Sequence, residues 1–250
     1  MRLIADESLR FSGHGLVRWK PPQSSVQESP AGRSLLGRHL YLARPFRQPT
    51  SYPRQRNYYG LYYFSQTRAH VWHESLNEAN MMTYLDHAES IQAIAAQPME
   101  IVFADGGRHV PDLIALHGNH RQVVYDIKPA ARITSKALEQ FAKTQAVCAT
   151  VGWGYEVLPG LPEQMQTNLT WLAHFKHPHF HPGPTATATL LANLETPLGF
   201  DTAAELLCPG KLPQGRSGLF HLLWLRTVGT DLNLRINSTT LVERTPRENA

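Results

Sequence analysis

Cysteine and long apolar runs are scarce in this chain of 250 residues. Only Cys148 and Cys208 are present, which excludes a disulfide-dense secreted fold and favours reduced thiols in the cytosol. No apolar stretch reaches the roughly 20 residues of a membrane-spanning helix, and the N-terminus has no apolar signal core. We therefore expect a cytoplasmic protein with no membrane partner.

Several functional signatures are missing as well. The sequence has no internal repeat, no glycine-rich nucleotide-binding loop and no Ser/His/Asp hydrolase pattern, so no nucleotide cofactor is expected. Acidic residues are few at the start: up to His70 there are 11 Lys/Arg against 3 Asp/Glu, and the remainder has 13 against 17. A basic first part suits a phosphate backbone, although a solvated basic tail explains the same bias.

The strongest functional pattern lies within Arg108–Pro129. Two apolar runs of strand length, residues 110–116 and 123–127, flank a break that contains Gly and Asn. This pattern predicts an antiparallel hairpin, in which the start of one strand lies beside the end of the next. Two carboxylates and an ammonium are therefore expected to converge at one end of the hairpin, those of Asp112, Asp126 and Lys128.

Such a group is typical of phosphodiester hydrolysis. Carboxylate oxygens bind Mg²⁺, which keeps several waters and polarises a phosphoryl oxygen. A neighbouring lysine orients the attacking water or stabilises the developing charge. The alternative is an exposed strand end where Asp126 and Lys128 form a solvated ion pair without a catalytic role.

A helix is expected over residues 74–90, with apolar residues at near-helical spacing on one side. Ser75 precedes Glu78 by three positions, as in a capping box. Glu78 then has two interpretations: it caps its own helix, or it is a third acidic residue of the site. Glu74, one turn earlier, is the alternative third acid.

These residues resemble the PD-(D/E)xK nuclease superfamily, through Pro111-Asp112 and Asp126-Ile127-Lys128. With Ser75–Glu78 and Gln97-Pro98 before them, their order and spacing are similar to the TnsA-type transposon-end endonucleases, over roughly residues 58–160. That resemblance implies a metal site for Mg²⁺, or Mn²⁺ in its place, whose members are Glu78, Asp112, Asp126 and Lys128. The acids would hold the metal and Lys128 would serve the attacking water.

Two further segments bear on binding. Arginines interleave with aromatic residues before the expected nuclease domain, which suits DNA contact; they are Arg44, Arg47, Arg54 and Arg56. A histidine-rich stretch invites a zinc interpretation, but it has no cysteine partner and contains prolines. A linker is the better interpretation for its members, His174, His177, His179 and His181.

The sequence thus predicts an α/β protein, with a restriction-endonuclease-like mixed-sheet core and a C-terminal winged-helix-like module. Expected boundaries are a basic arm over residues 1–57, the nuclease domain over 58–160, a linker over 161–184 and the module over 185–250. Within the module, helix 216–228 is so apolar that protein binding competes with DNA reading as its role.

The resemblance implies a Mg²⁺-dependent endonuclease subunit of a cut-and-paste transposase. It would nick one strand of double-stranded DNA at transposon ends, beside an integrase-like transposase subunit, in the prokaryotic cytoplasm at the nucleoid. Two alternatives stay open. One is a stand-alone restriction or repair nuclease, and the other is an inactive nuclease fold that binds DNA during assembly.

Overall fold

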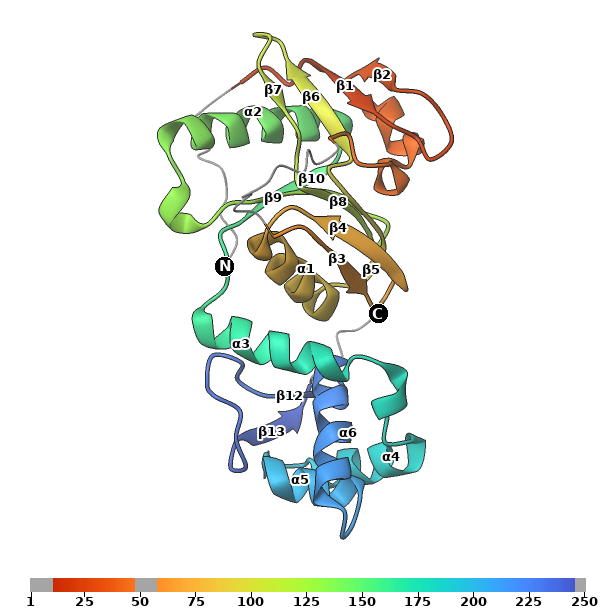
Figure 1. The fold of residues 1–250 in the computed structure, drawn as a ribbon, viewed down its shortest axis with the longest axis vertical. Helices are drawn as coiled ribbons and strands as arrows, with labels where there is room; N and C mark the ends of the chain where they lie inside the picture. Colours follow the sequence, from red (N-terminus) through yellow and green to blue (C-terminus); the bar gives the residue numbers. More distant parts are fainter. Residues whose placement is uncertain (1–10, 48–57, 246–250) are drawn as a thin grey trace. The chain divides into compact units, whose positions relative to one another are not determined.

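The computed structural model describes residues 11–47 and 58–245. The chain forms two compact units, residues 1–160 and 161–250 (Figure 1). The boundary after Gly160 is where the nuclease domain was expected to end. Helices and strands alternate through both units, which confirms the mixed α/β class. In the described ranges, no helix has the length and apolarity to cross a membrane.

The central sheet of the first unit has four strands in the order β10-β9-β8-β5. Their bounds are Ile91–Ala96 for β5, Leu113–His117 for β8, Gln122–Ile127 for β9 and Gly154–Leu158 for β10. Neighbours are antiparallel except β9 and β10, which are parallel. A parallel pair needs a crossover, and helix α2 (Ser135–Val151) provides it. The sheet is therefore mixed.

The β8–β9 hairpin confirms the pairing expected from the sequence. Its register pairs Leu113 with Tyr125 and Leu116 with Gln122. One step beyond the first pair, Asp112 faces Asp126, so both carboxylates belong to the same end of the ribbon. His120 adopts a left-handed conformation in the turn, with φ of 61°.

A second sheet has the order β2-β1-β6-β7 and is antiparallel. Its strands are Gly15–Trp19 for β1, Gln27–Pro30 for β2, Met99–Phe103 for β6 and Arg108–His109 for β7. Gln97-Pro98 bends the chain from β5 into β6, as the proline suggested, and Gln97 has a left-handed φ of 46°. The bend carries the chain from one sheet to the other.

This sheet corrects the expectation of a basic arm over residues 1–57. In the described part of that range, β1 pairs along its whole length with β6, and Val17 and Trp19 are buried. Short 3-10 helices follow, η1 (Arg33–Arg38) and η2 (Leu40–Leu42). Truncating a buried tryptophan such as Trp19 typically costs about 3–5 kcal/mol of stability. The segment is thus structural, and its partner strand lies too far along the sequence for local patterns to reveal it.

Helix α1 (Leu76–Ala88) packs against a hairpin that consists of β3 (Gly60–Phe64) and β4 (Ala69–His73). Buried Asp86 on α1 connects them, because its carboxylate accepts hydrogen bonds from Ser65 N at 2.9 Å, from Ser65 Oγ at 2.8 Å and from the Tyr62 hydroxyl at 3.1 Å. Burial first, and the Asp86 charge second, raise the pKa of Tyr62. In Figure 1, α1 and α2 lie on opposite sides of the central sheet.

The core of the first unit is shared by both sheets and α2. Its buried members include Trp19 from β1, Ile101 from β6, Val124 from β9 and Val147 from α2. Packing α2 between the two sheets fixes the face that it turns toward β9. That face positions the side chains described below.

The second unit contains helices, a small antiparallel sheet of order β11-β13-β12, and its own core. The helices are α3 (Glu163–Leu172), η4 (Ala173–Phe175), η5 (Pro178–Phe180), α4 (Pro184–Asn193), α5 (Phe200–Leu207) and α6 (Leu212–Trp224). The strands are β11 (Leu198–Gly199), β12 (Val228–Gly229) and β13 (Leu241–Arg244).

Two expectations for this region are corrected. Residues 161–184 are more than a linker, because Leu172 of α3 is fully buried in the core of the unit and Asn168 donates to the carbonyls of Leu232 and Leu234 at 2.8 Å. The apolar helix spans Leu212–Trp224 rather than 216–228.

The apolar side chains of α6 are used within the unit. Leu219, Leu222, Leu223 and Trp224 are buried in its core, whereas Leu225 just after the helix is 49% exposed. Close contact with α5 explains Gly215 of α6, since a Cβ at this position would lie 2.1 Å from the carbonyl oxygen of Ala204. The apolarity of α6 therefore reflects internal packing and is no evidence for a partner.

Candidate active site

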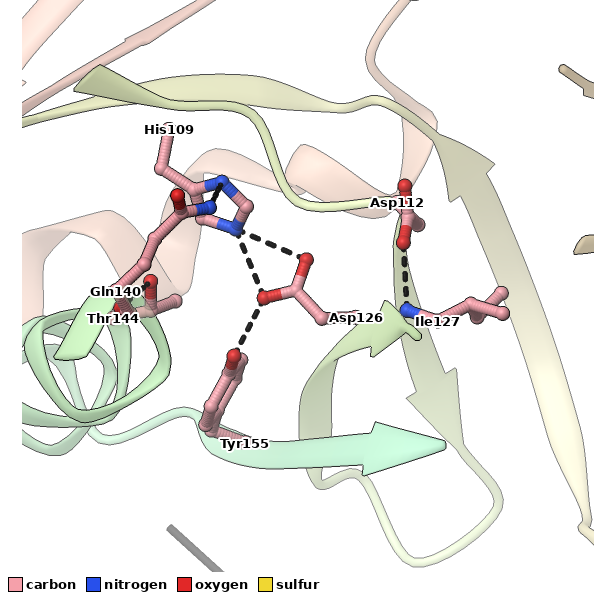
Figure 2. A network of polar contacts seen from close by, with 7 residues as sticks. All are labelled: His109, Asp112, Asp126, Ile127, Gln140, Thr144 and Tyr155. Atoms are coloured by element: carbon pink, nitrogen blue, oxygen red, sulfur yellow. Dashed lines mark hydrogen bonds and ion pairs between the residues drawn. The ribbon is translucent and has the colours of Figure 1, made fainter. Parts of the chain in front are cut away.

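Asp126 lies at the end of β9, under α2, and is almost completely buried. Its carboxylate is held from two sides (Figure 2). His109 Nε2 lies 3.0 Å from Oδ1 and 2.9 Å from Oδ2, and the Tyr155 hydroxyl donates to Oδ2 at 2.5 Å. Burial first, and the Asp126 charge second, raise the pKa of Tyr155 well above its usual range. Tyr155 therefore stays a hydrogen-bond donor to this carboxylate.

His109 is itself oriented by α2. Gln140 Nε2 contacts His109 Nδ1, and Thr144 Oγ1 donates to the backbone carbonyl of Gln140 at 2.9 Å. If Gln140 donates to Nδ1, the proton of neutral His109 is on Nε2 and points at Asp126. The chain from α2 through His109 thus fixes the direction of the Asp126 carboxylate.

Asp112 lies just before β8 and is partly buried. Ile127 N donates to Asp112 Oδ2 at 2.6 Å, and Gln97 N donates to its backbone carbonyl at 2.8 Å. Burial raises the pKa of Asp112 well above its usual range, and the negative charges of Asp126, Glu78 and Glu74 raise it further, in that order. The carboxylates of Asp126, Glu78 and Glu74 are thus close enough to repel that of Asp112.

Lys128 shares a pocket with these two aspartates. The pocket has a volume of about 240 Å³, and its wall includes Arg47, His109, Asp112, Asp126, Lys128 and Gln140. Lys128 N donates to Leu158 O at 3.0 Å, which extends the β9–β10 pairing by one residue. Among the described residues, the Lys128 ammonium has no carboxylate partner within ion-pair distance. The Lys128 ammonium is therefore available beside two carboxylates, in a pocket that Arg47 also lines.

Glu78 is placed differently. Its carboxylate accepts hydrogen bonds from Glu74 N and from Ser75 Oγ, both at 2.8 Å, and Ser75 Oγ in turn accepts from Glu78 N. These are the contacts of the helix-capping interpretation. Burial raises the pKa of Glu78, against the effect of those hydrogen bonds. Glu78 is near enough to act on Asp112 electrostatically, but it does not line the pocket.

The expected DNA-binding arginines divide into two groups. Arg47 lines the pocket with the two aspartates. Arg44 is exposed and donates to the carbonyls of Pro21 and Ser24. Arg54 and Arg56 lie outside the described residues.

The histidine-rich stretch of the second unit was expected to be a linker without zinc. His177 Nδ1 accepts from His179 N, and His181 Nδ1 accepts from Gly183 N. These backbone contacts use one ring nitrogen of each histidine in local turns. His221 on α6 contacts the Phe175 carbonyl at 2.6 Å, so the stretch is attached to the second unit.

The donor set of the pocket fits a magnesium ion. Within residues 11–47 and 58–245, no three His, Cys, Asp or Glu side chains are arranged to hold one ion together. Mg²⁺ needs fewer, because it is commonly bound through one or two carboxylates and keeps its other waters. Asp112 and Asp126 meet that requirement, and a cation would offset the repulsion that Asp126 adds to the effect of burial on the pKa of Asp112. Glu78 joins them only if it leaves its cap contacts.

Sequence reasoning missed three residues of this site: His109, Gln140 and Tyr155. His109 lies within the stretch Arg108–Pro129, but the sequence pattern assigned it no role. Gln140 and Tyr155 come from α2 and β10, which approach Asp126 only after the crossover has formed. The chain matches no protein-family model and no curated protein sequence, so its function is inferred from this site.

Proposed function

We propose that the protein is a Mg²⁺-dependent DNA endonuclease, with Mn²⁺ able to substitute, that hydrolyses one phosphodiester bond per site. The observation that carries this proposal is the pocket where Asp112, Asp126 and Lys128 meet at one end of the β8–β9 hairpin. Phosphodiester hydrolysis needs carboxylates for the metal and a cation beside the attacking water. Both are present in one small pocket.

The residues have distinct roles in this proposal. Asp112 and Asp126 would hold Mg²⁺, which when bound supplies charge for the phosphoryl oxygen and lowers the pKa of water. Lys128 orients the attacking water and stabilises negative charge developing on the phosphate. His109 and Tyr155 keep the Asp126 carboxylate in place. The backbone N–H of Ile127 does the same for Asp112.

The assembly in which it acts is part of the proposal. The motif order similar to TnsA-type endonucleases supports a nicking subunit that works beside an integrase-like transposase at transposon ends. The second unit follows the order α4-β11-α5-α6 and then β12 and β13, which supports a winged-helix module. Arg216 on α6 is paired with Asp201 at 2.5 Å, so DNA reading by α6 needs other polar side chains.

One observation favours an alternative. Glu78 is engaged in its own helix cap, which is compatible with a nuclease fold that binds DNA without cutting it. A nicking assay decides between the two. Supercoiled plasmid carrying candidate end sequences is incubated with the protein, alone and with a candidate integrase-like transposase, in Mg²⁺, Mn²⁺ or EDTA.

Activity should require the divalent cation and disappear in Asp126→Asn and Lys128→Ala. Retained nicking in both variants would remove this pocket from the mechanism. Metal-dependent nicking without the transposase would favour a stand-alone nuclease. No nicking under any condition, with DNA binding intact, would favour the inactive assembly subunit.

A further inference from the structure

A larger pocket adjoins the proposed active site in the first unit. Its volume is about 830 Å³, and its wall includes Lys20, Ser25, Val26, Arg44, Arg47 and Trp72. We call it the basic-aromatic pocket. Its residues come from the end of β1, the segment after it, the segment after η2, and β4. These segments are far apart in the sequence, so only the fold brings them together.

Three cations line this pocket without acidic partners. In the described part of the chain, neither Lys20 nor Arg44 nor Arg47 forms an ion pair with Asp or Glu. The contrast is with Arg18 on the same strand as Lys20, which contacts Glu28 at 3.3 Å and Glu100 at 3.1 Å. The pocket therefore carries uncompensated positive charge.

Two of these cations are held in place by backbone carbonyls. Lys20 Nζ donates to Phe46 O at 2.7 Å, and Arg44 donates to Pro21 O at 3.1 Å and Ser24 O at 2.8 Å. Such contacts use some donors and leave the charge in place. Positive groups that are already ordered lose less side-chain entropy on binding an anion.

Trp72 lines the same pocket as the three cations and provides an aromatic surface there. The indole ring is stacked on Tyr59, with centroids 6.0 Å apart and an interplanar angle of 18°. Trp72 lies opposite Leu61 in the β3–β4 hairpin, and Leu61 is 65% exposed. Basic groups beside aromatic rings are the combination that binds single-stranded nucleic acid, through phosphates and stacked bases.

Arg47 connects this pocket to the proposed active site, because it lines both. A phosphate chain that reaches Asp112 and Asp126 can therefore continue past Arg47 toward Lys20 and Trp72. A cavity of about 830 Å³ is within the range of small-ligand pockets. It accepts one or two nucleotides, whereas a base inside a stacked duplex exposes no face to an indole.

Building on the proposed nuclease function, we propose that the basic-aromatic pocket binds an unpaired stretch of the DNA strand that adjoins the scissile phosphate. Lys20, Arg44 and Arg47 bind its phosphates, and a base stacks against Trp72. The enzyme thus separates the strands locally on one side of the cut. Substrates that are already frayed or tailed at that side bind more tightly than blunt duplex.

The test measures binding in Ca²⁺, where cleavage is suppressed, by fluorescence anisotropy with a tailed duplex and a matched blunt duplex. Trp72→Ala should weaken binding to the tailed DNA by about tenfold and leave the blunt duplex nearly unchanged. Lys20→Gln should lower the slope of log affinity against log salt by about 0.7 on the tail. Arg121→Ala is the control, since this exposed arginine lies at the opposite end of the β8–β9 hairpin.

A second measurement requires no variant. Wild-type protein is irradiated with tailed DNA that carries 5-iodouracil in the tail, and the crosslinked peptide is sequenced. Crosslinking at Trp72 or Tyr59 supports the proposal. Crosslinking only elsewhere, or equal loss for tailed and blunt DNA in Trp72→Ala, overturns it. If nicking occurs but the tail gives no advantage, this inference fails alone, whereas tail binding without any nicking defeats the proposed catalytic function.

Discussion

Replacing Asp112 by asparagine should stabilise the protein at neutral pH when no divalent cation is present. In the folded state, burial and three neighbouring carboxylates raise the pKa of Asp112 well above its usual range. The folded state then holds a proton that the unfolded chain, with a pKa near 3.9, has released. Stability conferred by this group is therefore greatest below about pH 4 and is lost as the pH rises through the folded pKa. Asparagine does not ionise, so the variant avoids this loss.

The magnitude follows from the same linkage. Each unit by which the folded pKa is raised costs about 1.4 kcal/mol above that pKa, so the variant should be more stable than wild type at neutral pH. The hydrogen bond from Ile127 N is retained, because the asparagine carbonyl oxygen accepts it. For a domain of this size, 1 kcal/mol corresponds to about 2–4 °C in Tm. The variant is therefore expected to have a higher Tm than wild type.

Addition of a divalent cation should reverse the order of stability of wild type and Asp112→Asn. A ligand at about 100 times its Kd stabilises the folded state by about 2.7 kcal/mol, and Asp112 is one of the two carboxylates that would bind it. Wild-type protein should therefore gain several degrees in Tm on addition of Mg²⁺ or Ca²⁺, and Asp112→Asn should gain much less. Differential scanning calorimetry between pH 4 and pH 8, with EDTA or with the cation, measures both effects.

Asp105→Asn is the matched control. Asp105 is exposed, and its hydrogen bond with Lys143 lowers its pKa, so this variant should keep the wild-type response to the cation. The reasoning is refuted if Asp112→Asn is less stable than wild type at neutral pH and its response to Mg²⁺ is unchanged. Asp112 would then serve only to anchor the backbone of Ile127.

Three other predictions concern separate features. Lys128→Ala should abolish nicking and keep a Tm within about 1 °C of wild type, since the half-buried ammonium of Lys128 lacks a carboxylate partner among the described residues. Normal nicking by this variant, or an equal loss of nicking in the exposed control Lys136→Ala, would contradict the prediction. Glu78→Gln keeps a side-chain acceptor for the helix cap, so its free energy of unfolding should change by less than about 1 kcal/mol. If nicking is lost nonetheless, Glu78 is a metal ligand. If its nicking activity equals that of the control Glu74→Gln, Glu78 only caps the helix. Burial lowers the pKa of His221, so the second unit should be most stable above about pH 6.5 and lose stability as the pH falls through the folded pKa. A free energy of unfolding of residues 161–250 that does not depend on pH between 5 and 7 would exclude this effect.

Local patterns were sufficient for the hairpin and for the elements around it. Two apolar runs of strand length around a Gly-Asn turn predicted β8 and β9, and their antiparallel register follows from the turn. The same is true of the helix that begins after Ser75. In each case the interacting residues are close in sequence, so the pattern contains both partners.

Pairing between strands that are far apart in the sequence could not be predicted from local patterns. β1 has little periodicity of its own, and its strand character depends on β6, whose partner residues lie more than 80 positions away (Val17 pairs with Ile101). The apolar side of α6 indicated a buried face, but the sequence does not say whether that face meets the same unit or another protein. The structure shows that Leu219 and Leu222 pack within the unit.

For the candidate site, the sequence by itself determined which residues share one end of a ribbon: Asp112, Asp126 and Lys128. That conclusion depends only on strand geometry, since side chains two apart lie on one face and paired strands run in opposite directions. Tertiary structure alone decided the environment of these groups. Tyr155 of β10 and His109 of β7 contact the Asp126 carboxylate, Gln140 of α2 contacts His109, and helix α1 places Glu78 near Asp112. Burial and mutual repulsion, which set the pKa of Asp112, are properties of that packing and of no segment taken alone.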